Sequence, residues 1–203
     1  LAHFAATPLS AVEVCATAAE WFAFALLMRS VAGRFRAPWL ALAMLCLPFR
    51  LLIVERHVAP AELLGAGLAL VLWTFTRDKH KVVASACMLG FAIALRELEP
   101  FRFTPVAQSF RWIPFAATFA AERQDAILVL LRKAFDYGSM VWLLRAAGLR
   151  YLKAGVATAA ALLLLEFLQR HLPGRQPEIT DAVIAVLMAC VLWGARTARG
   201  ATE

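Results

Sequence analysis

Long apolar stretches separated by short charged connections are the feature that most limits what this chain can fold into. A helix that crosses the hydrocarbon core of a membrane needs about 20 apolar residues, with a range of roughly 17–25. Only helices and closed barrels cross, because every backbone polar group must be paired within them. We predict seven transmembrane helices: Val12–Val31, Pro38–Val54, Pro60–Thr76, Val82–Leu98, Asp125–Ala147, Tyr151–Gln169 and Glu178–Ala195.

The composition agrees with a membrane protein. Hydrophobic residues make up 62% of the 203 residues and charged residues 17%, and the mean hydropathy is +0.70. Soluble domains are roughly 45–50% apolar. The net charge of +7 could indicate a nucleic-acid-binding protein, but the lysines and arginines stand between the apolar stretches, where the positive-inside rule expects them. We therefore exclude nucleic acid as a partner.

The charges in the connections predict the orientation of the chain. The connections after the first, third, fifth and last spans carry a net positive charge, whereas those after the second, fourth and sixth sum to zero. Since cytoplasmic connections are enriched in Lys and Arg, we predict an outside N-terminus and an inside C-terminus. A missed or spurious span would break this alternation, so it also supports the count of seven.

We predict an all-α polytopic membrane protein that forms a single membrane domain over residues 1–203. Residues 1–98 hold four spans, and residues 99–195 hold three spans and one long connection. That connection, residues 99–124, carries three prolines and six aromatic residues, which is too aromatic for a solvated loop. We interpret it as an interfacial segment with its rings at the headgroup level. A re-entrant segment or a lid over a site is the alternative.

No metal or cofactor site is predicted. The four cysteines (Cys15, Cys46, Cys87 and Cys190) lie inside apolar stretches, and the four histidines lie at the ends of such stretches. Neither residue type shows the spacing of a metal motif, so we interpret the cysteines as small buried hydrophobic residues. The sequence begins with Leu1, so the absence of a signal peptide here carries no weight.

A group of three charged residues lies two to three turns into the fifth predicted span. Arg132 and Asp136 are spaced i,i+4, and Lys133 and Asp136 are spaced i,i+3, so the acid can pair within its own helix. Charges inside a membrane are costly and need a partner or a wet cavity. The cluster is either self-neutralised and snorkelling, or it is a basic site for an anionic headgroup.

A second polar group surrounds the sixth predicted connection. Glu166 and Gln169 share one helix face near the outer end of the sixth span, and Glu178 and Asp181, also spaced i,i+3, lie at the outer start of the seventh. The short connection must bring these residues and Arg175 together, and Arg175 could clamp an acid with two hydrogen bonds. The group is either a polar staple between two helices or part of a site. The fourth span also ends in polar residues on the predicted outer side, which favours an outward-facing polar cavity.

Three stretches of the chain resemble the VanZ-like family. The first runs from Phe101-Arg102-Phe103 to Arg111-Trp112-Ile113-Pro114-Phe115, and the second is Leu131-Arg132-Lys133-Ala134-Phe135-Asp136-Tyr137-Gly138. The third and most specific joins Glu166-Phe167-Leu168-Gln169, Leu172-Pro173-Gly174-Arg175 and Glu178-Ile179-Thr180-Asp181. The resemblance covers about residues 99–195. It implies a bacterial inner-membrane protein of a family whose founding member is associated with resistance to the glycopeptide teicoplanin, and it brings no established reaction.

We expect the chain to bind a lipid-linked or anionic glycan headgroup at the periplasmic face and to assist cell-envelope or polysaccharide processing or glycopeptide resistance. Its partners would be membrane lipids, such a glycan and envelope-biosynthesis proteins. The expected site residues are Arg132, Lys133, Asp136, Glu166, Gln169, Arg175 and Asp181. An intramembrane enzyme that uses Glu166 and Asp181 as an acid/base pair and a structural membrane scaffold are the alternatives. A transporter is disfavoured, because no inverted repeat is visible.

Overall fold

The computed structural model describes residues 10–31, 60–116 and 123–200. The chain divides into two compact units, the first ending at Leu95 and the second beginning at Arg96. The predicted second span, Pro38–Val54, lies outside the described residues, and the prediction of a single domain over the whole chain stays a prediction.

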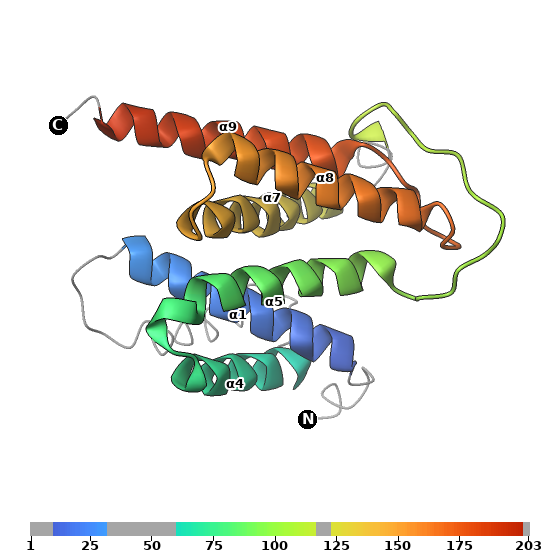
Figure 1. The fold of residues 1–203 in the computed structure, drawn as a ribbon. Helices are drawn as coiled ribbons and strands as arrows, with labels where there is room; N and C mark the ends of the chain where they lie inside the picture. Colours follow the sequence, from blue (N-terminus) through green and yellow to red (C-terminus); the bar gives the residue numbers. More distant parts are fainter. Residues whose placement is uncertain (1–9, 32–59, 117–122, 201–203) are drawn as a thin grey trace. The chain divides into compact units, whose positions relative to one another are not determined.

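All regular elements in the described residues are helices, as predicted, and one isolated parallel β-bridge joins Arg111 to Glu178. Each helix begins and ends within a few residues of a predicted span (Figure 1). The helices are α1 (Ala11–Val31), α4 (Pro60–Phe75), α5 (Asp78–Leu98), α7 (Arg123–Ala146), α8 (Tyr151–Gln169) and α9 (Thr180–Gly200).

Three of these helices, α1, α8 and α9, are long and apolar enough to cross a membrane. Helix α4 is equally apolar but shorter. Helices α5 and α7 carry more charge, because α5 opens with Asp78, Lys79 and Lys81 and α7 contains the predicted polar cluster around Lys133. The length and hydropathy of these three helices therefore fit a membrane protein, and the remaining predicted spans depend on the charge pattern.

Small residues allow α1 and α4 to pack closely in the first unit. A Cβ atom on Gly65 of α4 would lie 2.7 Å from the Cβ of Thr17 on α1. Beside this contact, the fully buried ring of Phe22 lies edge to face with Trp73, with ring centroids 5.3 Å apart. Helix association in a membrane depends on such close packing, because lipid is as apolar as the side chains.

A charged cluster joins the end of α1 to the start of α5. One carboxylate oxygen of Asp78 lies 2.9 Å from Arg29 Nη1 and 2.8 Å from Lys81 Nζ. The Lys81 ammonium also lies 4.2 Å from the ring centre of Trp73, where a cation is attracted to the aromatic face. Hydrogen bonds from Arg29 and then Lys81 lower the pKa of Asp78 from 3.8 to about 2.

Helices α7, α8 and α9 pack against one another in the second unit. Their apolar contact is built on Val141, Ala154 and Ala189, one from each helix. One face of α8 is buried along its whole length, and its residues recur every three or four positions. The residues on that face are small at the start of α8 and polar at its end. They are Ala154, Gly155, Thr158, Leu162, Glu166 and Gln169.

The second unit hides polar groups and exposes apolar ones, the reverse of a soluble protein. Asp181 is 1% exposed and Glu166 is 4% exposed, whereas Leu152 is 78% exposed and Leu164 is 61% exposed. Exposed leucines are favourable where the surroundings are lipid tails. The arrangement thus fits the apolar helices α8 and α9 as membrane spans.

The interpretation of the cysteines as buried residues is wrong for three of them. Cys15, Cys87 and Cys190 are all exposed. A membrane-spanning helix has no need to bury its apolar residues inside the protein, so an apolar stretch does not predict burial there. Cys46 lies outside the described residues.

Candidate functional site

Asp181 is the centre of a polar cluster in the second unit. It lies in the first turn of α9, where the positive end of the helix dipole favours a carboxylate. One of its oxygens lies 2.5 Å from Lys133 Nζ and the other accepts a hydrogen bond of 2.5 Å from the Tyr137 hydroxyl. Both partners come from α7, where their i,i+4 spacing places them on one face of the helix.

Glu166 and Gln169 bring α8 into the same cluster. The Glu166 carboxylate accepts a hydrogen bond of 3.0 Å from the backbone N–H of Glu178, just before α9. Gln169 donates a hydrogen bond of 2.7 Å to the carboxylate of Glu97 at the end of α5. Lys133 lies within electrostatic range of Asp181, Glu97 and Glu166. We call these residues the acidic cluster: Glu97, Lys133, Tyr137, Glu166, Gln169 and Asp181.

The acidic cluster holds more hydrogen-bond acceptors than donors. Three carboxylates, those of Glu97, Glu166 and Asp181, surround the single ammonium of Lys133. Carboxylates are acceptors when ionised, whereas an ammonium is a donor only. A buried ion pair with surplus acid is costly unless further donors reach it. The cluster can therefore accept hydrogen bonds from hydroxyl or cationic groups of a ligand.

Asp136 lies beside this cluster and faces Arg132. Asp136 is buried, and its Oδ2 lies 3.9 Å from Arg132 Nε. Its Oδ1 is buried with no hydrogen-bond partner among the described residues. The spacing in the sequence allows Asp136 to pair with Arg132 or with Lys133, but Lys133 pairs with Asp181. Tertiary packing of α9 against α7 offers Lys133 a closer carboxylate than its own helix does.

Arg175 reaches backbone carbonyls in place of the expected acid. Its Nη2 lies 2.6 Å from the carbonyl oxygen of Arg96 and 2.8 Å from that of Glu99, and its Nε lies 3.0 Å from the latter. The orphan carbonyls at the end of a helix are ready acceptors for such a cation. Arg175 thus caps the end of α5 and joins it to the α8–α9 connection.

Residues 99–116, which we call the strap, lie along the α8–α9 connection. Backbone N–H groups of the strap donate to the connection at His171, Arg170 and Pro177, with N–O distances of 2.7, 2.7 and 3.0 Å. Phe115 N also donates to the Thr180 hydroxyl at 2.6 Å. The strap therefore holds the connection whose two ends carry Gln169 and Asp181.

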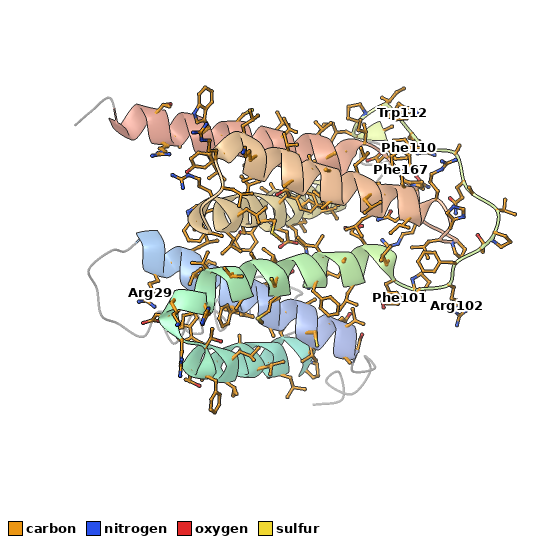
Figure 2. The ribbon with its side chains drawn as sticks, viewed as in Figure 1. Arg29, Phe101, Arg102, Phe110, Trp112 and Phe167 are labelled. Atoms are coloured by element: carbon orange, nitrogen blue, oxygen red, sulfur yellow. The ribbon has the colours of Figure 1, made fainter. Side chains whose placement is uncertain are left out.

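Aromatic rings fix one end of the strap to α8. Phe110 stacks on Phe167 with ring centroids 4.9 Å apart, and Trp112 lies 4.8 Å from Phe110 (Figure 2). Other large side chains of the strap point outward, and Phe103, Trp112 and Ile113 are more than half exposed. The strap combines a paired backbone with an exposed apolar surface, as expected of a segment at the headgroup level.

Two members of the acidic cluster were not predicted as site residues. In the sequence, Tyr137 cannot be told from an aromatic residue of the core. Its i,i+4 spacing from Lys133 is the one indication that the two side chains could contact the same group. Glu97 is one of the polar residues that end the fourth predicted span, but its contact with Gln169 spans 72 positions, and no local pattern indicates it. Within the described ranges, no three His, Cys, Asp or Glu side chains come together as a group that could hold a metal ion.

Comparison of the chain with known protein families, with curated proteins and with solved structures finds no match.

Proposed function

We propose that this chain is a seven-span bacterial inner-membrane protein of the VanZ-like type that binds the headgroup of a lipid-linked glycan at the periplasmic face. The acidic cluster is the headgroup site, and the bound glycan belongs to cell-envelope or polysaccharide processing, with glycopeptide resistance as one outcome. The observation that carries the proposal is the almost fully buried Asp181, held by Lys133 and Tyr137 beside two further carboxylates.

The cost of such a cluster favours a role in binding. Ionisable groups within membrane segments are expensive, and they mark functional sites by default. Replacing a buried ion pair by apolar side chains is often neutral or stabilising, so helix packing alone gives little reason to keep three carboxylates. The cluster lies where α8 ends and α9 begins, which the proposed topology puts at the periplasmic face.

The chemistry of the cluster favours a sugar over a simple anion. Sugar hydroxyls donate hydrogen bonds, and carboxylate and carboxamide oxygens accept them. Lys133 and Arg175, which were expected to contact anionic groups, are held by Asp181 and by backbone carbonyls. Arg132 is 54% exposed at its side chain, and it is the cation we assign to a phosphate of the ligand.

The strap supports closure over the bound headgroup. Its backbone follows the α8–α9 connection, whose ends carry cluster residues, and its rings lie against α8 at Phe167. A headgroup held beneath such a segment is shielded from water, which strengthens each polar contact.

An enzyme is the second candidate, because Glu166 and Asp181 are buried in one cluster and lie within electrostatic range of each other. Paired carboxylates with different surroundings can divide the roles of acid and base. An enzyme would convert the bound glycan, so Glu166→Gln would accumulate the unchanged ligand on the protein. A binding protein would instead lose the ligand in this variant.

The test is native mass spectrometry of the protein extracted in mild detergent. We expect the wild type to carry a polyprenyl-linked glycan, and Asp181→Asn and Glu166→Gln to carry much less. Glu13→Gln is the matched control, since it neutralises an exposed carboxylate on α1 and should retain the ligand. The proposal would be contradicted if the wild type carried no glycan, or if folded Asp181→Asn protein retained as much glycan as the wild type. Either result would favour a structural scaffold.

A further inference from the structure

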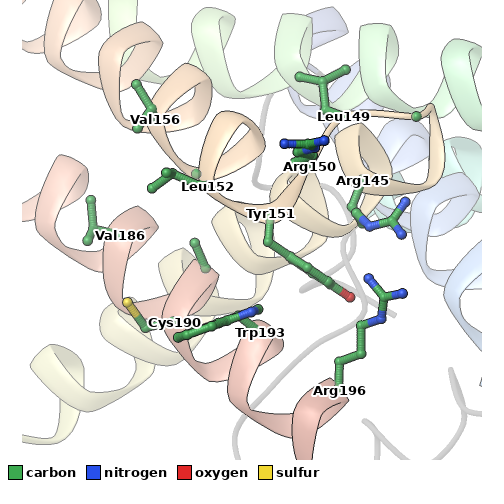
Figure 3. A pocket seen from close by; sticks show the side chains of 13 residues that line it. Arg145, Leu149, Arg150, Tyr151, Leu152, Val156, Val186, Cys190, Trp193 and Arg196 are labelled. Carbon is green, nitrogen blue, oxygen red and sulfur yellow. The ribbon is translucent and has the colours of Figure 1, made fainter. Parts of the chain in front are cut away.

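A cavity of about 760 Å³ opens at the other end of α8 from the acidic cluster. It lies among the last turn of α7, the α7–α8 connection, the start of α8 and the second half of α9 (Figure 3). Its size falls within the roughly 300–1,000 Å³ typical of pockets for small molecules. We call it the basic pocket.

Three arginines and no acidic residue line the basic pocket. Arg145, Arg150 and Arg196 are among the 13 lining residues, and none of these is Asp or Glu. The guanidinium carbons of Arg145 and Arg196 lie 5.5 and 6.0 Å from the ring centre of Tyr151. Figure 3 shows both guanidinium groups beside this one ring. Two cations held at one ring repel each other, and an anion placed between them relieves that repulsion.

The remaining wall of the basic pocket is apolar and open to the surroundings. Leu152 and Val156 of α8 face Val186 and Trp193 of α9 across the cavity. All four side chains are exposed, between 47% and 78%. The pocket wall is thus continuous with the apolar surface that the two spans present to lipid tails.

The close contact of α8 and α9 forms the floor of the pocket. Gly155 has no side chain, and a Cβ atom there would lie 2.6 Å from the Cβ of Ala189. Larger side chains stand on either side of this contact, so the two helices form a groove along their length. A groove of this shape fits an extended hydrocarbon chain. Each methylene group that enters the groove stabilises the complex, because it leaves water or gains closer van der Waals contacts.

We propose that the basic pocket binds one phosphate-bearing membrane lipid. The phosphate lies between Arg145 and Arg196, with Arg150 as a further cation of the pocket lining, since one guanidinium group can donate two parallel hydrogen bonds to phosphate oxygens. The hydrocarbon chain lies in the groove over Gly155 and Ala189. A free phosphate ion would use only the arginines, whereas a lipid uses both halves of the pocket. This site is separate from the acidic cluster, and neither proposal depends on the other.

The first test is titration of the purified full chain with lipid in detergent, followed by native mass spectrometry. We expect one phosphatidylglycerol molecule to bind about tenfold more tightly than phosphatidylcholine with the same chains, because the arginines favour a net negative headgroup. Arg145→Gln/Arg196→Gln should remove this preference. Arg102→Gln, which removes an exposed arginine of the strap, is the matched control and should keep it.

One further variant and one competitor decide the remaining outcomes. Arg145→Lys/Arg196→Lys keeps the charge, so it should fold and retain part of the preference. Inorganic phosphate at millimolar concentration should leave the lipid in place, since it cannot fill the groove. Equal binding of both lipids, an unchanged preference in the glutamine variant, or release of the lipid by phosphate would each overturn the proposal.

A second measurement needs no variant. Cys190 lines the basic pocket and is exposed, so a bound lipid should slow its alkylation by a maleimide. Cys87 is also exposed but lies in α5, outside the pocket, and it should react at the same rate with and without lipid. Phosphatidylglycerol that leaves the alkylation of Cys190 unchanged would contradict the proposed position of the chain.

Discussion

Gly155 and Ala189 bring α8 and α9 so close that a Cβ atom on the glycine would lie 2.6 Å from the Cβ of the alanine. Real Cβ atoms almost never approach within this distance. The Cβ of Ala189 is fixed to its backbone, so it cannot rotate away as the end of a long side chain could. The two helices must therefore move apart if the glycine acquires a side chain.

Gly155→Ala should destabilise the protein by about 1–3 kcal/mol, the usual cost of overpacking. Thermal unfolding in detergent measures the change as a lower Tm. Gly194→Ala is the matched control, because Gly194 lies on the neighbouring helix α9 and a Cβ atom there would meet nothing within 4 Å. A Gly155→Ala variant as stable as this control would contradict the close contact.

Asp181→Asn should destabilise the second unit by about 3 kcal/mol, because it leaves the Lys133 ammonium without its closest counter-charge. Tyr137→Phe should cost about 1 kcal/mol, the usual value of one hydrogen bond. Adding Lys133→Met to Asp181→Asn should cost less than Lys133→Met costs in the wild type, since the ion pair is already broken. Unfolding titrations of the single and double variants measure the coupling. Additive losses would show that the two side chains do not interact.

Acid should weaken the contact between α1 and α5. The pKa of Asp78 is lowered to about 2 by Arg29 and Lys81, so its ionised form stabilises the folded state. That contribution is complete above the unfolded pKa of about 4, and it disappears as the pH falls through the folded pKa. The wild type should thus lose more stability than Asp78→Asn between pH 4 and pH 2. Because Asp78 is exposed, 1 M salt should reduce the difference. Parallel curves at low salt would contradict the ion pair.

Phe167→Ala should release the strap from α8, since it removes the ring on which Phe110 stacks. Trypsin should then cut more rapidly after Arg102 and Arg111, both of which are exposed strap residues. Leu168→Ala is the matched control, because Leu168 is the next residue of α8 and is similarly exposed, at 39% against 37%. Equal cleavage rates in the two variants would show that the aromatic stack does not hold the strap.

The proposed topology can be tested with single cysteines. In a variant whose four native cysteines are replaced by alanine, Pro173→Cys should react with a membrane-impermeant maleimide added to spheroplasts. Ala147→Cys should react only after the membrane is opened. Both positions are exposed, in the α8–α9 and α7–α8 connections respectively. Labelling of Ala147→Cys in sealed spheroplasts would contradict the orientation that the positive charges predict.

The helices could be predicted because each is built on a long stretch rich in apolar residues, bounded by short polar connections. Helix α8 begins and ends at Tyr151 and Gln169 as predicted, since the connections on both sides are short and charged. The convergence of Glu166 and Asp181 could also be predicted, because a short connection forces its two ends together. These inferences use chain length and hydropathy alone.

The partners within the site could not be predicted, because they depend on how the helices pack. Lys133 has Asp136 one turn away in sequence but pairs with Asp181, which is 48 positions distant. The strap contacts the α8–α9 connection mainly through backbone hydrogen bonds. Such bonds do not depend on residue type, so the sequence does not indicate them. The sequence suggests an acidic partner for Arg175, yet its guanidinium donates hydrogen bonds to carbonyl oxygens at the end of α5. Unpaired carbonyl groups at a helix end are also good acceptors.

The ion pair between Lys133 and Asp181 also bears on how the protein is made. In the proposed topology, α7 reaches the membrane with its ammonium before α9 has been synthesised. A ribosome adds roughly 5–20 residues per second, so the 48 positions between the two residues correspond to a delay of a few seconds. In this topology, α7 would be a poor candidate to enter lipid alone during that interval, and the insertion machinery would have to retain it until α9 arrives. Biogenesis of the second unit would then be cooperative, with α9 completing the entry of α7.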